Sequence, residues 1–167
     1  MWFPVEWAKL NNMEKIKVYV GCGLTHAPSG YKEAIAIFKQ QLSRVLWIEV
    51  LEFVTPNSVS SAPDSRHIYR NDIYECVGMA HAMIGDLSYP STGLGWELGT
   101  AIEKHGIRVF MCMHKDATVS HLPIGAQHEN NHATLHTYEE SILDLLDYFI
   151  EELQQLHQVL QLKKALP

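Results

Sequence analysis

Short apolar segments that alternate with helix-like segments most constrain how this chain can fold. Four apolar segments have the length and the Val, Ile, Leu and Phe content of buried strands: 16–21, 47–54, 82–87 and 107–113. Helical periodicity or capping residues mark the stretches between them: 31–42, 64–80 and 95–104. Strands that alternate with helices are typical of a parallel sheet covered on both faces.

We therefore expect a doubly wound α/β domain with five parallel strands in flavodoxin-like, Rossmann-like order. The fifth strand is expected at 133–137 and a long helix at 138–162, whereas the Ser-, Pro- and Asn-rich stretch 55–64 is expected to be a loop. Ligands bind such sheets beyond the carboxyl ends of the strands. We expect three parts: an amino-terminal extension at 1–13, the α/β domain at 14–150 and a carboxy-terminal helical extension at 151–167.

Composition narrows the classes of function. The 167 residues suit one domain, and a net charge of −6 without a Lys/Arg cluster argues against nucleic-acid binding. No apolar run is long enough for a bilayer span, and the amino terminus lacks the pattern of a signal peptide. The three cysteines are odd in number and form no CxxC motif, which indicates a reducing, cytoplasmic location.

The ten histidines follow no metal-binding motif such as HExxH. Five of them fall in one polar stretch: His114, His121, His128, His132 and His136. We interpret these as solvated loop residues in preference to a metal site, and we expect neither a metal nor a cofactor.

The densest chemical signal is GDLSYPSTGLGWELGTA at 85–101, where a strand ends, a Gly-rich loop turns and a helix begins. Gly93 and Gly95 permit close approach of the backbone to a ligand. Glu97, expected in the first turn of that helix, would be favoured as an anion and could attack a sugar carbon. The alternative is a surface glutamate stabilised by the helix dipole. Dinucleotide binding is rejected because the motif does not follow the first strand.

Two further side chains are candidates. Asp72 lies one turn from Ile68 and Cys76, at the edge of the apolar face of its helix, where a carboxyl is partly removed from water, as suits a proton donor. The alternative is an exposed surface aspartate. Tyr19 lies two residues before the end of the first strand, on the face opposite Val18 and Val20. It is either a core tyrosine or a hydroxyl that faces the cleft.

Three segments, VYVGCGLTHAPSGYKEAI, IYRND and STGLGWELGTA, together resemble the nucleoside 2-deoxyribosyltransferase superfamily, which includes the 2'-deoxynucleoside 5'-phosphate N-hydrolases. The resemblance runs from about residue 16 to 149. It implies that Glu97 is a covalent nucleophile, that Asp72 handles protonation of the base and that Tyr19 lies beside the nucleophile. Asn131 is similar to a residue that reaches into a neighbouring subunit's site. A homodimer or higher homo-oligomer with shared active sites is implied.

The loops divide between the branches of that superfamily. Gly21, Gly23 and Thr25 in the first loop look like the transferases, whereas Ser91 matches a serine that binds the 5'-phosphate in the hydrolases. Thr25, His26 and Ser91 would together form a different phosphate pocket. We expect transfer of a deoxyribosyl group between bases, with hydrolysis of nucleoside monophosphates as the alternative. A nucleotide-binding module without turnover stays open as a third possibility.

The last helix carries one apolar seam at alternating spacings of four and three: Ile142, Leu146, Phe149, Leu153, Leu156 and Leu160. The first half of the seam should cover the sheet. The second half extends past the expected domain, so we expect it to pack on another subunit, with an amphipathic tail as the alternative.

Overall fold

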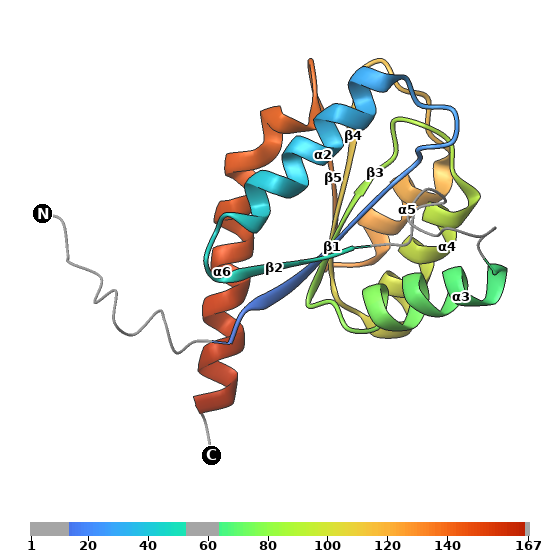
Figure 1. Ribbon diagram of the computed structural model, residues 1–167. Helices are drawn as coiled ribbons and strands as arrows, with labels where there is room; N and C mark the ends of the chain where they lie inside the picture. The colour runs from blue at the N-terminus through green and yellow to red at the C-terminus, as the bar shows by residue number, and fades with distance from the viewer. Residues whose placement is uncertain (1–13, 53–63, 166–167) are drawn as a thin grey trace, which may run out of the picture.

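Five parallel strands form the centre of the protein in the computed structural model, which describes residues 14–52 and 64–165 (Figure 1). The strands are β1 Ile16–Cys22, β2 Ile48–Leu51, β3 Ala82–Asp86, β4 Arg108–His114 and β5 Ala133–Tyr138. Their order in the sheet is β2-β1-β3-β4-β5, which confirms the predicted doubly wound topology. The expected extension at 1–13 and the expected loop, up to residue 63, lie outside the described residues.

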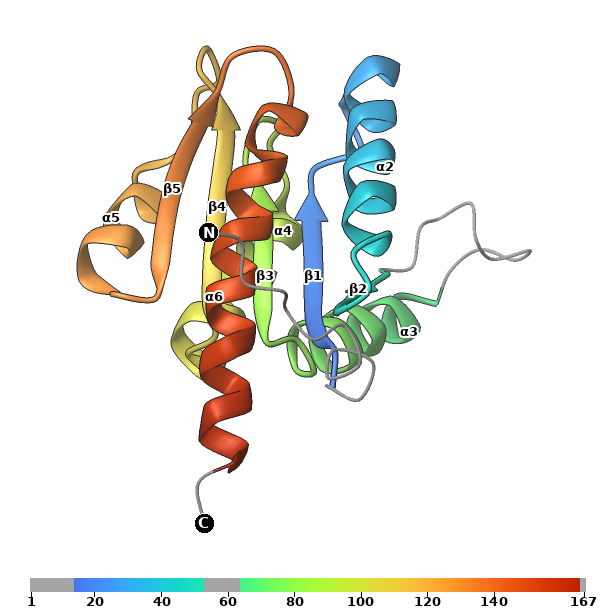
Figure 2. The same ribbon diagram turned by 90° about the vertical axis from the view of Figure 1, so that its left-hand side faces the viewer.

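Helices cover both faces of this sheet. On one face lie α2 Ser29–Ser43 and α6 Leu146–Ala165; on the other lie α3 Ser65–Tyr69, α4 Thr92–Gly99 and α5 His121–Glu129 (Figures 1 and 2). No helix in the described part of the chain has both the length and the apolar character to cross a membrane.

The core follows the alternation of side chains along the strands. Val18 and Val20 of β1 pack with Phe38 of α2 and Phe149 of α6 in one buried cluster. Tyr19, between the two valines, belongs to the second cluster, on the face that α4 covers. The predicted orientation of Tyr19 is therefore confirmed.

Caps set where the helices on the second face begin. Ser91 accepts a hydrogen bond from the Leu94 N–H at 3.1 Å, so α4 begins at Thr92, earlier than the predicted residue 95. Asp64 caps α3 in the same way: its side chain accepts the Arg66 N–H at 3.1 Å. Each helix then continues as a wider π-helical segment: η2 Arg70–Val77 after α3, and η3 Thr100–His105 after α4.

Two other regions differ from the prediction. Helix α5 was expected to be loop, and none of its residues is buried, so it has no apolar stripe that periodicity could detect. The last helix starts later than predicted because β5 extends to Tyr138. Ser141 and Asp144 then form a capping box, and the 3-10 turn η4 Ile142–Leu145 leads into α6.

The second half of α6 packs on its own domain, where we expected another subunit. His157 is 4% exposed and stacks on Trp47 with ring centroids 5.3 Å apart. Its Nε2 lies 2.8 Å from the Glu14 carbonyl oxygen. Val159 and Leu162 are the exposed apolar residues of this half.

Helix α4 lies very close to the sheet because two glycines leave room for it. Gly21 of β1 and Gly85 of β3 are register partners on the same face. A Cβ atom on Gly21 would lie 2.9 Å from Leu94 Cδ1, and one on Gly85 would lie 2.8 Å from Leu98 Cδ2. Both distances are shorter than carbon atoms tolerate, so a side chain at either position would displace the leucine that packs on it.

Replacing Gly85 by alanine should therefore destabilise the protein by about 1–3 kcal/mol, because the added methyl group displaces Leu98 in a packed core. Gly99→Ala is the matched control. This helical glycine has open space around its Cβ position, so alanine should stabilise the chain by about 0.5–1 kcal/mol. Urea unfolding of both variants measures the difference, and equal effects would contradict the proposed close contact.

Candidate active site

Glu97 points from α4 toward the end of β1. A Cβ atom on Gly21 would lie 2.9 Å from Glu97 Oε2, so the carboxylate occupies space beside the strand that a side chain there would fill. The hydroxyl of Tyr19 donates a hydrogen bond to the Glu97 carboxylate. Tyr19 is 1% exposed, so it is a core tyrosine whose hydroxyl is satisfied by Glu97, which is the first of the two interpretations that the sequence left open.

The electrostatics of Glu97 differ from the prediction. Burial raises the pKa of Glu97 to about 7, the charge of Asp72 adds to this rise, and the hydrogen bond from Tyr19 opposes it. We expected the helix amino terminus to favour the anion. Because α4 begins at Thr92, Glu97 lies in its second turn, where the effect of the dipole has largely fallen away, and the loss of hydration dominates.

Asp72 is the third member of this group. It is half-buried on η2, and the side-chain amide of Asn71 donates a hydrogen bond to its Oδ1 at 3.0 Å. Burial raises the pKa of Tyr19 far above its ordinary value, and the charges of Glu97 and Asp72 raise it further. The three predicted catalytic residues, which are far apart in the sequence, are thus brought close enough to interact.

Two loops meet beyond the carboxyl ends of β1 and β3, where the strand order reverses. A Cβ atom on Gly23 would lie 2.5 Å from the carbonyl oxygen of Tyr89 and 3.2 Å from Ser91 Cβ, so only glycine permits this contact. Thr25 and His26 are exposed on the loop that follows Gly23. The structure therefore places the loop of Thr25 and His26 against the loop of Ser91.

The remaining predicted binding residues divide into two groups. Gly93 and Gly95 are exposed in the first turns of α4, and a Cβ atom on Gly95 would meet nothing within 4 Å. Asn131 lies before β5, at the amino ends of the strands, where its carbonyl oxygen accepts a hydrogen bond from Arg108 at 3.2 Å. The structure does not bring Asn131 to Glu97 within one chain, and its role toward a neighbouring subunit stays a prediction.

Sequence reasoning missed several residues around these groups. Asn71 had no motif of its own, although its place next to Asp72 was a signal. The backbone carbonyl of Glu52, at the end of β2, lies 3.4 Å from the Cys76 thiol, which donates to it. The polar residues at the ends of β3, β4 and β5, including the fully buried Asp86, were also missed because no sequence motif joins them.

An apolar groove of about 640 Å³ lies between α4 and α5, beside Ser91. Leu94 and Leu98 line one wall, and Leu122 of α5 lines the other. Glu97 does not line this groove, so the groove and the group of ionisable residues around Glu97 are separate. Among the described residues, no cluster of three or more His, Cys, Asp or Glu side chains could hold a metal ion.

Comparison with known proteins shows the fold alone. No model of a protein family matches the chain, and no curated protein matches it either. Among solved structures, a conserved protein from Enterococcus faecalis V583 is similar, with a TM-score of 0.55 and 21% identity. The match covers 83% of this chain and 99% of that protein. At this level of identity the similarity supports the doubly wound α/β architecture.

The raised pKa of Glu97 predicts a specific dependence of stability on pH. Folding favours the protonated carboxyl, so its contribution to stability is complete below the ordinary pKa of 4.5 and is lost as the pH rises through about 7. Glu97→Gln, which mimics the neutral carboxyl, should raise the free energy of unfolding by about 1–3 kcal/mol near pH 8.5 and leave it nearly unchanged near pH 4.

Urea unfolding across this pH range measures the effect. Glu103→Gln is the control, because Glu103 is an exposed glutamate on the continuation of the same helix. A Glu97→Gln variant whose stability relative to the original chain does not change with pH would contradict burial of an ionisable Glu97.

Proposed function

We propose that this protein cleaves the N-glycosidic bond of a 2'-deoxyribonucleoside and transfers the deoxyribosyl group to another base, with Glu97 as the covalent nucleophile. One observation carries the proposal: a partly desolvated carboxyl, Glu97, shares a hydrogen bond with Tyr19 and interacts with Asp72 beside the strand ends of a doubly wound sheet. Groups whose pKa values are perturbed by burial and by a neighbouring charge are typical of catalytic sites.

The reaction would proceed by double displacement. In the reacting form the pair of carboxyls holds one proton, on Asp72: a Glu97 oxygen attacks the anomeric carbon, the bond to the base nitrogen breaks, and its electron pair leaves with the base, which takes that proton from Asp72. The incoming base then attacks the same carbon, the ester bond to Glu97 breaks, and Asp72 takes up the proton that the new base loses. Two inversions give net retention, as in retaining glycosidases.

Each of the three side chains has a distinct part in this scheme. Tyr19 donates to the Glu97 carboxylate and so holds it in one orientation, which lowers the entropic cost of attack. Burial removes water from the carboxylate and so makes it a better nucleophile once it is ionised. Asn71 donates to Asp72 and fixes the position of the acid beside the leaving base.

Hydrolysis of a nucleoside 5'-monophosphate is the second candidate function, with water in place of the incoming base. The observation that favours it is the place of Ser91, at the cap of α4 and against the loop that carries Thr25 and His26. The Ser91 oxygen already accepts the Leu94 N–H, but its own proton remains available to donate to a phosphate. A binding module without turnover would use neither Asp72 nor a desolvated Glu97.

Removal of the nucleophile should abolish the reaction. Glu97→Gln is expected to lower the rate of base release from deoxyinosine by roughly three orders of magnitude or more, and Glu103→Gln should leave it unchanged. The rate of the original chain should rise with pH through about 7, because only ionised Glu97 attacks. Chromatography of the free base measures both. A Glu97→Gln variant that retains turnover would refute the proposal. In a separate experiment on the original chain, a 2-fluoro-2-deoxyarabinosyl nucleoside should label Glu97 covalently.

Ser91→Asp separates the two candidate reactions better than Ser91→Ala. Aspartate caps a helix as well as serine does, so α4 is preserved, whereas its charge repels a phosphate. If the protein is a monophosphate hydrolase, the KM for a deoxynucleoside monophosphate should rise about tenfold or more, with little change for the nucleoside. Equal effects on both substrates would exclude contact between Ser91 and phosphate, and transfer to an added acceptor base would identify the transferase.

A further inference from the structure

A chain of polar contacts leads from the end of β2 to Asp72 and passes through a buried thiol. Cys76 of η2 is 3% exposed, and its Sγ lies 3.4 Å from the carbonyl oxygen of Glu52, the residue that follows β2. The side-chain nitrogen of Asn71, Nδ2, lies 3.6 Å from Cys76 Sγ and 3.5 Å from the same carbonyl oxygen. That nitrogen also donates to Asp72 Oδ1 at 3.0 Å. One thiol therefore contacts both the backbone beyond β2 and the amide that holds the proposed acid.

The thiol of Cys76 stays protonated at neutral pH. Burial raises its pKa to about 12, and the charges of Asp72 and Glu97 contribute to this rise. A thiol has one proton to donate, and the carbonyl oxygen of Glu52 can only accept. Cys76 therefore donates to Glu52 and presents the lone pairs of its sulfur to the amide of Asn71.

These contacts determine which end of the Asn71 amide faces Asp72. The three groups around Nδ2 all accept: Asp72 Oδ1, Cys76 Sγ and the Glu52 carbonyl oxygen. The contact with Asp72 is the strongest, because an N–H to oxygen contact is weak at 3.5 Å. Turning the amide over would place its oxygen beside the Glu52 carbonyl oxygen, and the single thiol proton could serve only one of these two oxygens.

The orientation of this amide matters most when Asp72 holds the proton that the proposed reaction requires. A protonated carboxyl pairs with either end of an amide: its carbonyl oxygen accepts from the nitrogen, or its O–H donates to the amide oxygen. In the second arrangement Asn71 would hold the proton that the base needs. Cys76 and Glu52 accept from Nδ2 and so keep the nitrogen toward Asp72 Oδ1, which leaves the proton on Oδ2.

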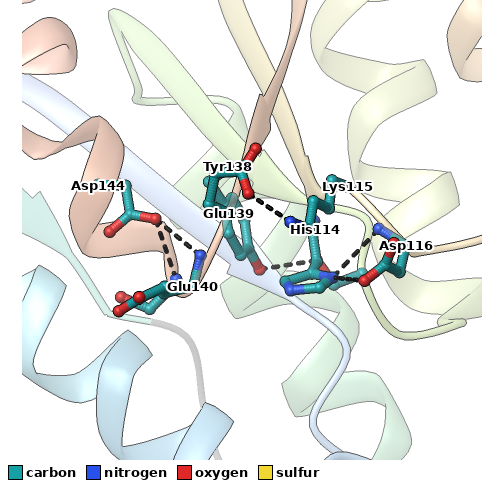
Figure 3. Close-up of polar contacts among 9 residues, drawn as sticks. His114, Lys115, Asp116, Tyr138, Glu139, Glu140 and Asp144 are labelled. Atoms are coloured by element: carbon teal, nitrogen blue, oxygen red, sulfur yellow. Dashed lines mark hydrogen bonds and ion pairs between the residues drawn. The ribbon is translucent and has the colours of Figure 1, made fainter.

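The polar contacts at the ends of β4 and β5 have a different character (Figure 3). Asp144 accepts the backbone N–H of Glu140 at 2.9 Å, and Lys115 is paired with Glu139. All four of these residues are exposed, and their contacts tie surface turns together. The contacts of Cys76, by contrast, centre on a buried side chain and end at the carboxyl of the proposed acid.

We propose that Cys76 is a positioning residue for this reaction: it orients the amide of Asn71 so that the proton of Asp72 stays on Oδ2, from which the leaving base takes it. This role rests on the proposed function. The O–H bond at Oδ2 breaks as the N–H bond of the base forms, and Oδ1 keeps its hydrogen bond from Asn71 throughout. Cys76 itself neither gives nor takes a proton in the reaction.

Two substrates test this role. The base of deoxyinosine needs a proton as it leaves, whereas the purine of 7-methyl-2'-deoxyguanosine already carries a positive charge and leaves as a neutral base without one. Cys76→Ala should lower the single-turnover rate of base release from deoxyinosine about three- to tenfold, the loss expected for a neutral hydrogen bond, and leave release from the methylated substrate unchanged. Cys76→Ser, which keeps a donor and an acceptor, should restore most of the rate. Equal effects on the two substrates, or no effect on deoxyinosine, would overturn the proposal.

Cys112→Ala is the matched control. It removes the sulfur of another buried cysteine, on the opposite face of the sheet, and should change neither rate. A double variant tests the path: because Cys76 acts through Asn71, Cys76→Ala combined with Asn71→Ala should lose no more than Asn71→Ala alone. Additive losses would show that Cys76 acts by another route and overturn the proposal.

A measurement without substrate separates this proposal from the proposed function. The NMR signal of the Asn71 side-chain amide, assigned by its loss in Asn71→Ala, should shift in Cys76→Ala and stay in place in Cys112→Ala. If the original chain releases no base while the amide shifts as expected, the proposed reaction fails and the orienting contact stands. An amide signal that does not respond to loss of the thiol overturns the role of Cys76, whatever the activity.

Discussion

The close contact between α4 and the central strands β1 and β3 is the constraint on which the candidate active site depends. Gly21 and Gly85 stand side by side on one face of the sheet and allow Leu94 and Leu98 to touch the backbone. The same approach carries Glu97 into a space beside Gly21 that any larger residue would occupy. Packing between a helix and a sheet, and not a local motif, therefore decides how much water the carboxylate retains.

Burial of Glu97 has a cost and a use. It raises the pKa of the carboxyl to about 7, so the folded protein holds an acid that changes charge near neutral pH. Tyr19 offsets part of that cost through its hydrogen bond, and Asp72 adds to it through its charge. A group kept in an unfavourable state by its surroundings is a feature of reactive sites, which is why we place the proposed chemistry at Glu97.

The carboxyl edge of the sheet carries two polar groups of different character. On the α4 face, two carboxyls and a tyrosine interact near the end of β1, where the loops of Gly23 and Ser91 meet. On the α2 and α6 face, Asp86 is buried and accepts a hydrogen bond from Tyr138, which joins β3 to β5. Tyr89 belongs to the loop between them: its carbonyl oxygen packs against Gly23, and its ring packs on Tyr31.

The amino-acid sequence by itself determined the order of strands and helices, because apolar spacing and caps such as Asp64 act over a few residues. Tyr19, Asp72 and Glu97, which the structure brings together, were candidates in the sequence, but the pattern of residues left a structural alternative open for each of them. It did not reveal α5, which has no buried face, or the start of α4 at Thr92, which depends on which of several polar residues becomes the cap.

Only the tertiary structure decided the charge behaviour of Glu97, the separation of Asn131 from that site within one chain, and the contact between Cys76 and Glu52. Each depends on distances between segments remote in sequence. Desolvation and close packing act across those distances, and no local pattern of residues encodes them.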